Sequence, residues 1–210
     1  MEPMTQVRPY RGVEAAERVA QRRRALLEAG LDLLGGEDAP AELTVRGICG
    51  RAGVSVRYFY ESFADKDEFV AAVFDWVVGD IAATTQAAVA AAPRDEQNRA
   101  GIANLVRVIA GDPRVGRLLF SSKLSNAVLV RKRGELGGLF AALSGQHVTN
   151  AYRVAENEWI KATTHFVVGG VAQAISAWLA GEIELGDDEL VDQLAALLNQ
   201  LADARLYRSE

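Results

Sequence analysis

The chain has 210 residues, of which 50% are hydrophobic, and a formal net charge of −5. This composition can fill a sizeable core, and the single cysteine, Cys49, excludes an intrachain disulfide. No apolar segment is long enough for a signal peptide or a membrane span, so we expect a cytoplasmic protein with no membrane partner. The first 66 residues have no net charge, and the acidic excess lies in the residues that follow. A neutral segment can still bind DNA if its basic side chains gather on one face.

The beginning of the chain predicts an arm and one helix. Residues 1–14 contain two prolines and a glycine without a helical period, so we expect a flexible N-terminal arm. From about residue 16 to residue 34 leucines recur at helical spacing, and the glycine pair that follows is a typical helix stop. This helix opens the first predicted domain, residues 15–66.

Two short helices with a glycine between them are predicted next. Thr44 is a plausible N-cap for a helix whose inward residues include Ile48 and Cys49, and Gly53 ends that helix. Ser55 is a second N-cap candidate only a few residues later. Two short helices joined by a tight turn that contains glycine make a helix-turn-helix.

The remaining residues, 67–210, predict long helices. Neither the alternating pattern of strands nor hairpin dipeptides occur, so we expect an all-α fold with an N-terminal three-helix helix-turn-helix domain and a larger helical domain. The LSGQHVTN segment, 143–150, is expected to separate two of the helices. The helices of this second domain are expected at about 67–91, 94–110, 113–124, 128–143, 155–181 and 188–205.

The helix that Ser55 opens is rich in aromatic residues. At about 100° per residue, Phe59 and Phe63 fall on one side with Val56 near them, whereas Arg57 and its neighbour one turn on, Glu61, fall on the other. The phenylalanines should anchor the helix and leave arginine and tyrosine for an outside partner such as a DNA major groove. Glu61 either accepts from a cytosine amino group or merely pairs with Arg57.

The segment LTVRGICGRAGVSVRYFYESFADKDEF resembles the DNA-binding module of the TetR family of bacterial transcriptional regulators. In that family a Thr opens the second helix, an Ile lies inside it, and a Gly-Val-Ser turn leads into a helix ending in Tyr-x-x-Phe-x-x-Lys. The resemblance covers roughly residues 22–69, and two positions depart from it: Arg57 stands where a small residue is common, and Gly30 where Ala is common. The matching positions are Thr44, Ile48, Gly53, Val54, Ser55, Tyr60, Phe63 and Lys66.

The candidate DNA contacts fall into three groups. Those at positions that the resemblance matches should hold the phosphate backbone: Thr44, Ser55, Tyr60 and Lys66. Those in the first turn of the third helix, which such a helix presents to the major groove, are candidates for base contacts: Val56, Arg57 and Tyr58. Arg46, at the start of the second helix, is a candidate for an adjacent phosphate.

For residues 67–210, the resemblance implies a small-molecule pocket among the central helices and dimerisation through the last two long helices. For each pocket candidate, core packing is the alternative. The pocket candidates are Trp76, Phe120, Phe140, Trp159, His165 and Phe166. The candidates for the dimer interface are Val171, Ile175, Trp178, Leu190, Leu194 and Leu198.

Together these features predict a homodimeric, ligand-responsive regulator that represses from a palindromic operator in double-stranded DNA and is released by a small, largely apolar ligand. The alternative is a helical small-molecule-binding or adaptor protein that no longer reads DNA. His147 and His165 lack the spacing of metal ligands, and no nucleophile-base set or phosphate-binding glycine loop is apparent. We therefore expect neither an enzyme, nor a cofactor, nor a metal site.

Overall fold

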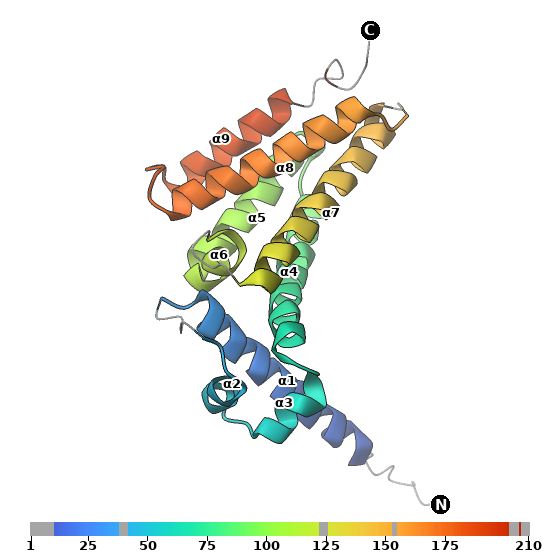
Figure 1. Cartoon of the computed structure of the whole chain (residues 1–210). Coiled ribbons are helices and arrows are strands. Elements are labelled where there is room, and N and C mark those ends of the chain that lie inside the picture. The colour runs from blue at the N-terminus through green and yellow to red at the C-terminus, as the bar shows by residue number, and fades with distance from the viewer. Residues whose placement is uncertain (1–10, 38–41, 122–125, 153–154, 202–205, 207–210) are drawn as a thin grey trace, which may run out of the picture.

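The computed structural model describes residues 11–37, 42–121, 126–152, 155–201 and 206, and it is built from helices (Figure 1). No strand occurs within these ranges, which confirms the predicted all-α fold. The helices are α1 (Arg11–Gly35), α2 (Val45–Ala52), α3 (Val56–Ser62), α4 (Lys66–Ala91), α5 (Gln97–Gly111), α6 (Pro113–Phe120), α7 (Ala127–Tyr152), α8 (Glu158–Leu179) and α9 (Asp187–Gln200), with a 3-10 turn at Arg94–Glu96.

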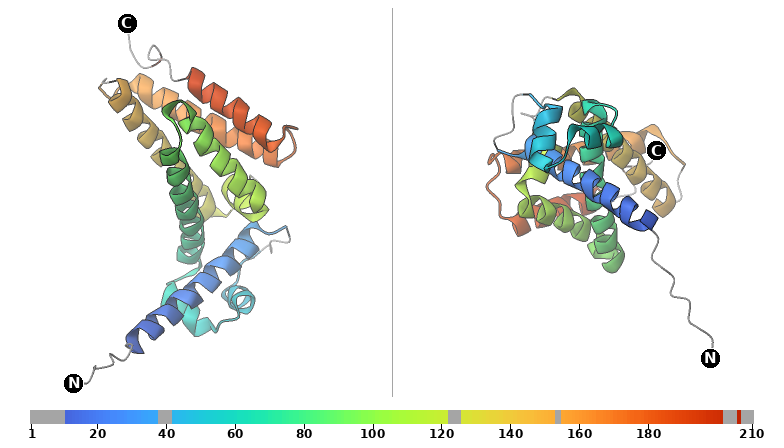
Figure 2. Two further views of the ribbon diagram at one scale, coloured as in Figure 1. Left: turned by 180° about the vertical axis from the view of Figure 1, so that it is seen from behind. Right: turned by 90° about the horizontal axis from the view of Figure 1, so that it is seen from below.

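The helices form a head and a body (Figures 1 and 2). The head consists of α1, α2 and α3, which pack on one another at one end of the molecule. The body consists of α4 to α9, with α8 and α9 lying across the end opposite the head. Two connections join the parts: α4 continues from the head into the body, and α6 packs against α1.

The helix-turn-helix forms from local capping, as the sequence predicts. The Thr44 side chain caps α2, its Oγ1 accepting a hydrogen bond from the backbone N–H of Gly47 at 3.1 Å. Gly53 ends α2 with a left-handed φ of 66°, which glycine adopts without the steric cost of a Cβ. Ser55 occupies the N-cap of α3 but makes no capping bond through its side chain.

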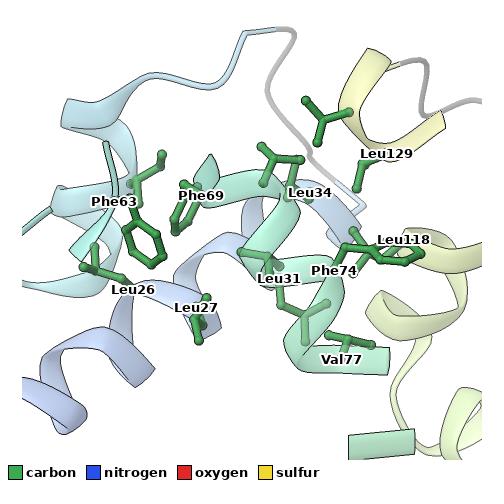
Figure 3. Close-up of a cluster of buried hydrophobic side chains, with 14 of the residues drawn as sticks. Leu26, Leu27, Leu31, Leu34, Phe63, Phe69, Phe74, Val77, Leu118 and Leu129 are labelled. Carbon is green, nitrogen blue, oxygen red and sulfur yellow. The ribbon is translucent and has the colours of Figure 1, made fainter. Parts of the chain in front are cut away.

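A hydrophobic cluster fills the head and extends into the body (Figure 3). Its aromatic centre consists of Phe59, Phe63 and Phe69, whose ring centroids lie 5.1 to 5.5 Å apart. Leucines of α1 surround these rings, and residues of α6 and α7 such as Leu118 and Leu129 extend the cluster. The inward direction predicted for Phe59 and Phe63 is confirmed, because both are buried.

Gly30 lies at the closest approach of α1 to α4. A Cβ added to this glycine would lie 2.7 Å from the Phe69 ring and closer still to Val73. Gly30 costs helix propensity, but it lets Phe69 and Val73 pack directly against the α1 backbone. This close packing explains why glycine stands where the TetR pattern commonly has alanine.

Three details of the sequence prediction need correction. Helix α1 begins at Arg11, so the last residues of the predicted arm are helical, while residues 1–10 lie outside the described ranges. Helix α7 runs through 143–150 to Tyr152, because this stretch packs on α8, with Gly145 facing Ile160. Val56 is 40% exposed although the helical wheel placed it near the buried phenylalanines. It is the first residue of α3, and a wheel gives direction without showing where the neighbouring helix ends.

Candidate nucleic-acid interface

The outer face of α3 is open to solvent. The Arg57 side chain is 85% exposed, and its Nε donates to Glu61 Oε1 at 2.9 Å, so the ion pair one turn along the helix is present. Tyr60 is 58% exposed on the same helix, and the Ser55 hydroxyl lies exposed at its start. These groups supply hydrogen-bond donors that suit phosphate oxygens and base edges.

Two arginines of α1 contact the aromatic side chains of α3 and of the residue that follows it. The Arg22 guanidinium lies over the Tyr58 ring, 4.1 Å from its centroid, and the Arg23 guanidinium lies 4.5 Å from the Phe63 ring. Arg23 also donates to the backbone carbonyl of Ser62 at 3.0 Å, where α3 ends. Tyr58 is therefore half-buried by Arg22, and its ring is less available for a base contact than the sequence predicts. The sequence has three successive arginines at 22–24, and such a run does not reveal the aromatic rings on which its side chains stack after folding.

The candidate DNA contacts near α2 differ in the bonds that they already make within the protein. Arg46 is exposed in the first turn of α2, and the Thr44 hydroxyl keeps its proton for donation while accepting from the backbone. Lys66, in contrast, donates to the backbone carbonyl of Leu43 at 3.1 Å and lies 3.9 Å from Glu42. A phosphate would have to compete with these oxygens for the ammonium group.

The pocket candidates of the body do not gather into one site. Trp76 and Phe120 are partly buried against the hydrophobic clusters, so core packing accounts for them. Trp159 and Phe166 are exposed by 59% and 70% on α8, and Phe140 is exposed by 45% on α7. Of the predicted set, His165 is the residue that lines a cleft between α7 and α8.

This α7–α8 cleft has a volume of about 350 Å³. Four of its six lining residues on α7 are glycine or alanine, and its side on α8 carries Ile160, Lys161, Thr164 and His165. The Lys161 ammonium is already paired with Glu158 at 2.9 Å. The remaining lining residues are Gly138, Ala141, Ala142, Gly145, Gln146, Thr149 and Glu156.

The interface candidates divide by burial within one protomer. Ile175, Leu190 and Leu194 are buried against α5 in a second hydrophobic cluster, so these side chains have no surface left for another subunit. Val171, Trp178 and Leu198 are partly buried at the edge of that cluster. The sequence period marked the apolar side of each helix correctly, but helices of the same chain occupy it: α5 packs on α9, and α6 and α7 pack on α8.

Other chemistry has little support in the described part of the chain. Cys49 is buried beneath α2, and burial raises the pKa of its thiol, which suits a core side chain rather than a reactive one. Among the residues whose placement is described, no group of His, Cys, Asp and Glu side chains is arranged to hold a metal ion. None of the described helices is both long and apolar enough to cross a membrane.

Comparison with known proteins identifies the fold. No protein-family model and no curated protein sequence matches the chain. Among solved structures, a putative TetR-family regulator from Rhodococcus sp. matches with a TM-score of 0.70 and 14% identity over 88% of this chain and all of that one. The fatty acid degradation regulator FadR from Bacillus halodurans matches with a TM-score of 0.65 and 16% identity over 84% of this chain and 94% of its own.

A third match is the transcriptional regulator FadR from Bacillus subtilis, solved in complex with stearoyl-CoA. It has a TM-score of 0.65 and 16% identity over 83% of this chain and 96% of its own. These similarities span head and body together, in proteins described as transcriptional regulators. The chain therefore has the fold of the TetR-type transcriptional regulators.

Proposed function

We propose that this protein is a DNA-binding transcriptional regulator that acts as a homodimer on a palindromic operator and represses until a small molecule releases it. The observation that carries the proposal is the recognition helix α3, which buries Phe59 completely and leaves Arg57 85% exposed. A helix anchored on one face with free donors on the other is what major-groove reading needs.

The ion pair of the recognition helix supports a role for Arg57 in base reading. Glu61 accepts from Nε of Arg57, while among the described residues no group bonds the two terminal nitrogens. Those nitrogens can donate to O6 and N7 of a guanine while Glu61 keeps the guanidinium oriented. Glu61 thus restricts Arg57 without consuming the donors that would contact the base.

The test uses the DNA upstream of the protein's own gene, in a gel shift at several salt concentrations. Arg57→Ala should cost about 1–3 kcal/mol on the specific site and relax its sequence preference, whereas Tyr60→Phe should weaken all sequences alike. Arg131→Ala is a matched control, because Arg131 pairs with Glu135 at the same spacing on α7, away from the head.

Two outcomes would contradict the DNA-binding proposal or its details. An unchanged preference among operator variants in Arg57→Ala would show that Arg57 does not read a base. If the unaltered protein shows no salt-dependent binding to that DNA, the regulator proposal fails. The result would then favour the alternative, a small-molecule-binding or adaptor protein that does not read DNA.

A homodimer is supported by the face of α8 that points away from the protomer. Trp159, Ala162, Phe166, Gly169 and Gly170 recur there at helical spacing and are all exposed. Large exposed aromatic side chains beside glycines allow another helix to approach closely, and a two-fold axis would place this face against its own copy. Helix α9 lies at the same end of the body as α8 (Figures 1 and 2). The proposed interface therefore lies on the helices that the sequence predicted, α8 and α9. It is formed by their outward-facing residues instead of the buried ones.

The dimer is tested by placing charges on this outer face. Phe166→Glu together with Leu197→Glu should give a monomer that stays helical, because Phe166 is 70% and Leu197 49% exposed in the protomer. Leu139→Glu on α7, where the leucine is 56% exposed, serves as the matched control and should stay dimeric. Sedimentation velocity and circular dichroism distinguish the results, and a dimeric double variant would move the interface elsewhere.

The ligand proposal rests on the α7–α8 cleft, whose volume of about 350 Å³ lies within the usual range of small-molecule sites. Its lining combines apolar side chains such as Ile160 with polar ones such as Thr149 and Lys161, which suits a small, largely apolar ligand that carries a polar group. Because one protein of the same fold was solved with stearoyl-CoA, fatty acyl compounds are the first probes. Binding of such a probe should lower operator affinity, and a probe that binds without any change in DNA affinity would contradict the coupling.

A further inference from the structure

Asp32, near the end of α1, binds one arginine from the head and one from the body. Arg51 of α2 reaches Asp32 Oδ2 with Nε at 2.8 Å and with Nη2 at 2.7 Å. Arg114 of α6 donates from Nη1 to the other oxygen, Oδ1. Each oxygen of one carboxylate therefore serves a different part of the molecule.

Arg114 is fixed to its own helix at the same time. Its Nε and Nη2 donate to the carboxylate of Asp112 at 2.9 and 2.6 Å, and Asp112 is also the N-cap of α6. This paired contact holds the guanidinium plane in place, since a bidentate arginine has little freedom to turn. The remaining nitrogen is thus a rigid extension of the first turn of α6, and it points at Asp32.

The backbones of α1 and α6 approach each other closely at this contact. A Cβ added to Gly35, the last residue of α1, would lie 2.9 Å from the carbonyl carbon of Arg114. Arg117 of α6 also donates to the carbonyl oxygen of Gly35. The end of α1 therefore touches the start of α6 directly, so a displacement of α6 must act on the Asp32 carboxylate.

The other side of α6 contacts α8, the helix that carries one wall of the cleft. The Ser176 hydroxyl donates to the carbonyl of Phe120 at 3.0 Å, where α6 ends. A Cβ added to Gly116 would lie 3.1 Å from Leu179, so these two helices are also in direct contact. Helix α6 therefore packs directly against α1 of the head and against α8, which lines the cleft.

We propose that Asp32 is a positioning residue that sets the placement of α2, and with it α3, according to the position of α6. A single carboxylate cannot keep ideal geometry to Arg51 and Arg114 when α6 moves relative to α1, so one contact must weaken or α2 must follow. The consequence at DNA rests on the proposed function, whereas the link between α6 and α2 does not.

The link is measured without DNA, by amide hydrogen exchange on the full chain. Arg114→Gln removes the charge that α6 presents to Asp32, and exchange in α2 and α3 should become faster although neither helix contains the substitution. Arg99→Gln is the matched control, because Arg99 forms an ion pair of 2.8 Å with Asp192 between α5 and α9 and should leave α2 unchanged. Unchanged exchange in α2 after Arg114→Gln would overturn the proposal.

A double-mutant cycle separates positioning from a merely structural role. In the Asp32→Asn background, Arg114→Gln should add nothing to the exchange of α2, because the carboxylate that joins the two arginines is already gone. Additive effects of the two substitutions would overturn the proposal, since they would show that Arg114 acts on the head by another route.

The DNA readout uses the same variants on the DNA upstream of the gene. Arg114→Gln should weaken binding about fivefold or more, the range of ordinary coupling between sites, with the salt dependence unchanged because Arg114 lies away from α3. Unchanged affinity would overturn the effect on DNA. If the unaltered protein does not bind this DNA, the proposed function fails, and the exchange cycle alone decides the role of Asp32.

Discussion

The aromatic cluster behind α3 and the outer face of α8 differ in the burial of their aromatic side chains. Behind α3, Phe59, Phe63 and Phe69, the last of them at the start of α4, are at most 1% exposed, and their rings contact one another. In the body, Trp159 and Phe166 of α8 are exposed by 59% and 70%. The head is a packed unit within one chain, whereas the body leaves large apolar side chains exposed on α8, the face to which the proposed homodimer assigns a partner.

This difference matters because each part has a different task in the proposed function. A recognition helix must present its donors in one geometry, so a rigid support behind it raises its selectivity for a sequence. The outer face of α8 needs complementarity to its own copy instead, and glycines such as Gly169 and Gly170 keep that face low between the aromatic side chains. Mutations should therefore act on folding in the head and on assembly in the body.

The largest expected effect comes from removing the aromatic centre of the head. Phe59→Ala should lower the free energy of unfolding by about 3–5 kcal/mol, because a fully buried ring leaves a cavity. Phe166→Ala is the matched change in the body and should alter protomer stability by about 0.5 kcal/mol or less, because that ring is exposed. Urea unfolding at a protein concentration low enough to keep the protein monomeric measures the free energy of unfolding of both variants. Equal losses for the two variants would contradict the comparison.

Gly30 gives the second largest effect and sharpens the same contrast. Gly30→Ala should destabilise by about 1–3 kcal/mol despite the better helix propensity of alanine, because the new methyl group meets Phe69 and Val73. Gly79→Ala, in α4 where no atom lies within 4 Å of the added Cβ, should instead stabilise by up to about 1 kcal/mol. Thermal unfolding of both variants is sufficient. A stabilised Gly30→Ala protein would show that Phe69 or Val73 can move aside.

The sequence predicted the head well because its signals are local. The caps at Thr44 and Ser55, the left-handed glycine at Gly53 and the spacing of Phe59 and Phe63 each depend on a few neighbouring residues. The start of α4 carries a local signal too, since Asp65 accepts from the N–H of Glu68 while Glu68 accepts from the N–H of Ala64.

The body was predicted less well because its signals depend on distant residues. The 143–150 stretch contains residues typical of a break, yet packing on α8 keeps it helical. The apolar period of α9 is real, but a period cannot tell whether α5 or a second subunit covers Leu190 and Leu194. Likewise, the composition of α1 could not reveal that Arg22 stacks on Tyr58, since the two residues meet only after folding.

The smallest expected effect is a dependence of stability on acid at the junction between head and body. Partial burial raises the pKa of the Asp32 carboxyl, but hydrogen bonds from Arg51 and Arg114 and the attraction of both guanidinium groups outweigh it, so the pKa lies below its usual range. For Asp112, the hydrogen bond from Arg114 is the main cause of a lowered pKa. A carboxyl whose pKa is lower in the folded state stabilises the fold above its unfolded pKa and loses that contribution as the pH falls.

Asp32→Asn should therefore be less stable than the unaltered protein by about 1 kcal/mol or less at pH 7, since the ion pairs are partly exposed. The difference should persist down to about pH 5, shrink as the pH falls through the usual Asp value of about 3.9, and disappear once the folded carboxyl is protonated. Urea unfolding of both proteins between pH 7 and pH 3 measures it. A difference that stays constant over this range would mean that Asp32 stabilises the junction by shape and hydrogen bonding rather than by charge, because asparagine keeps the size of the side chain but not its titration.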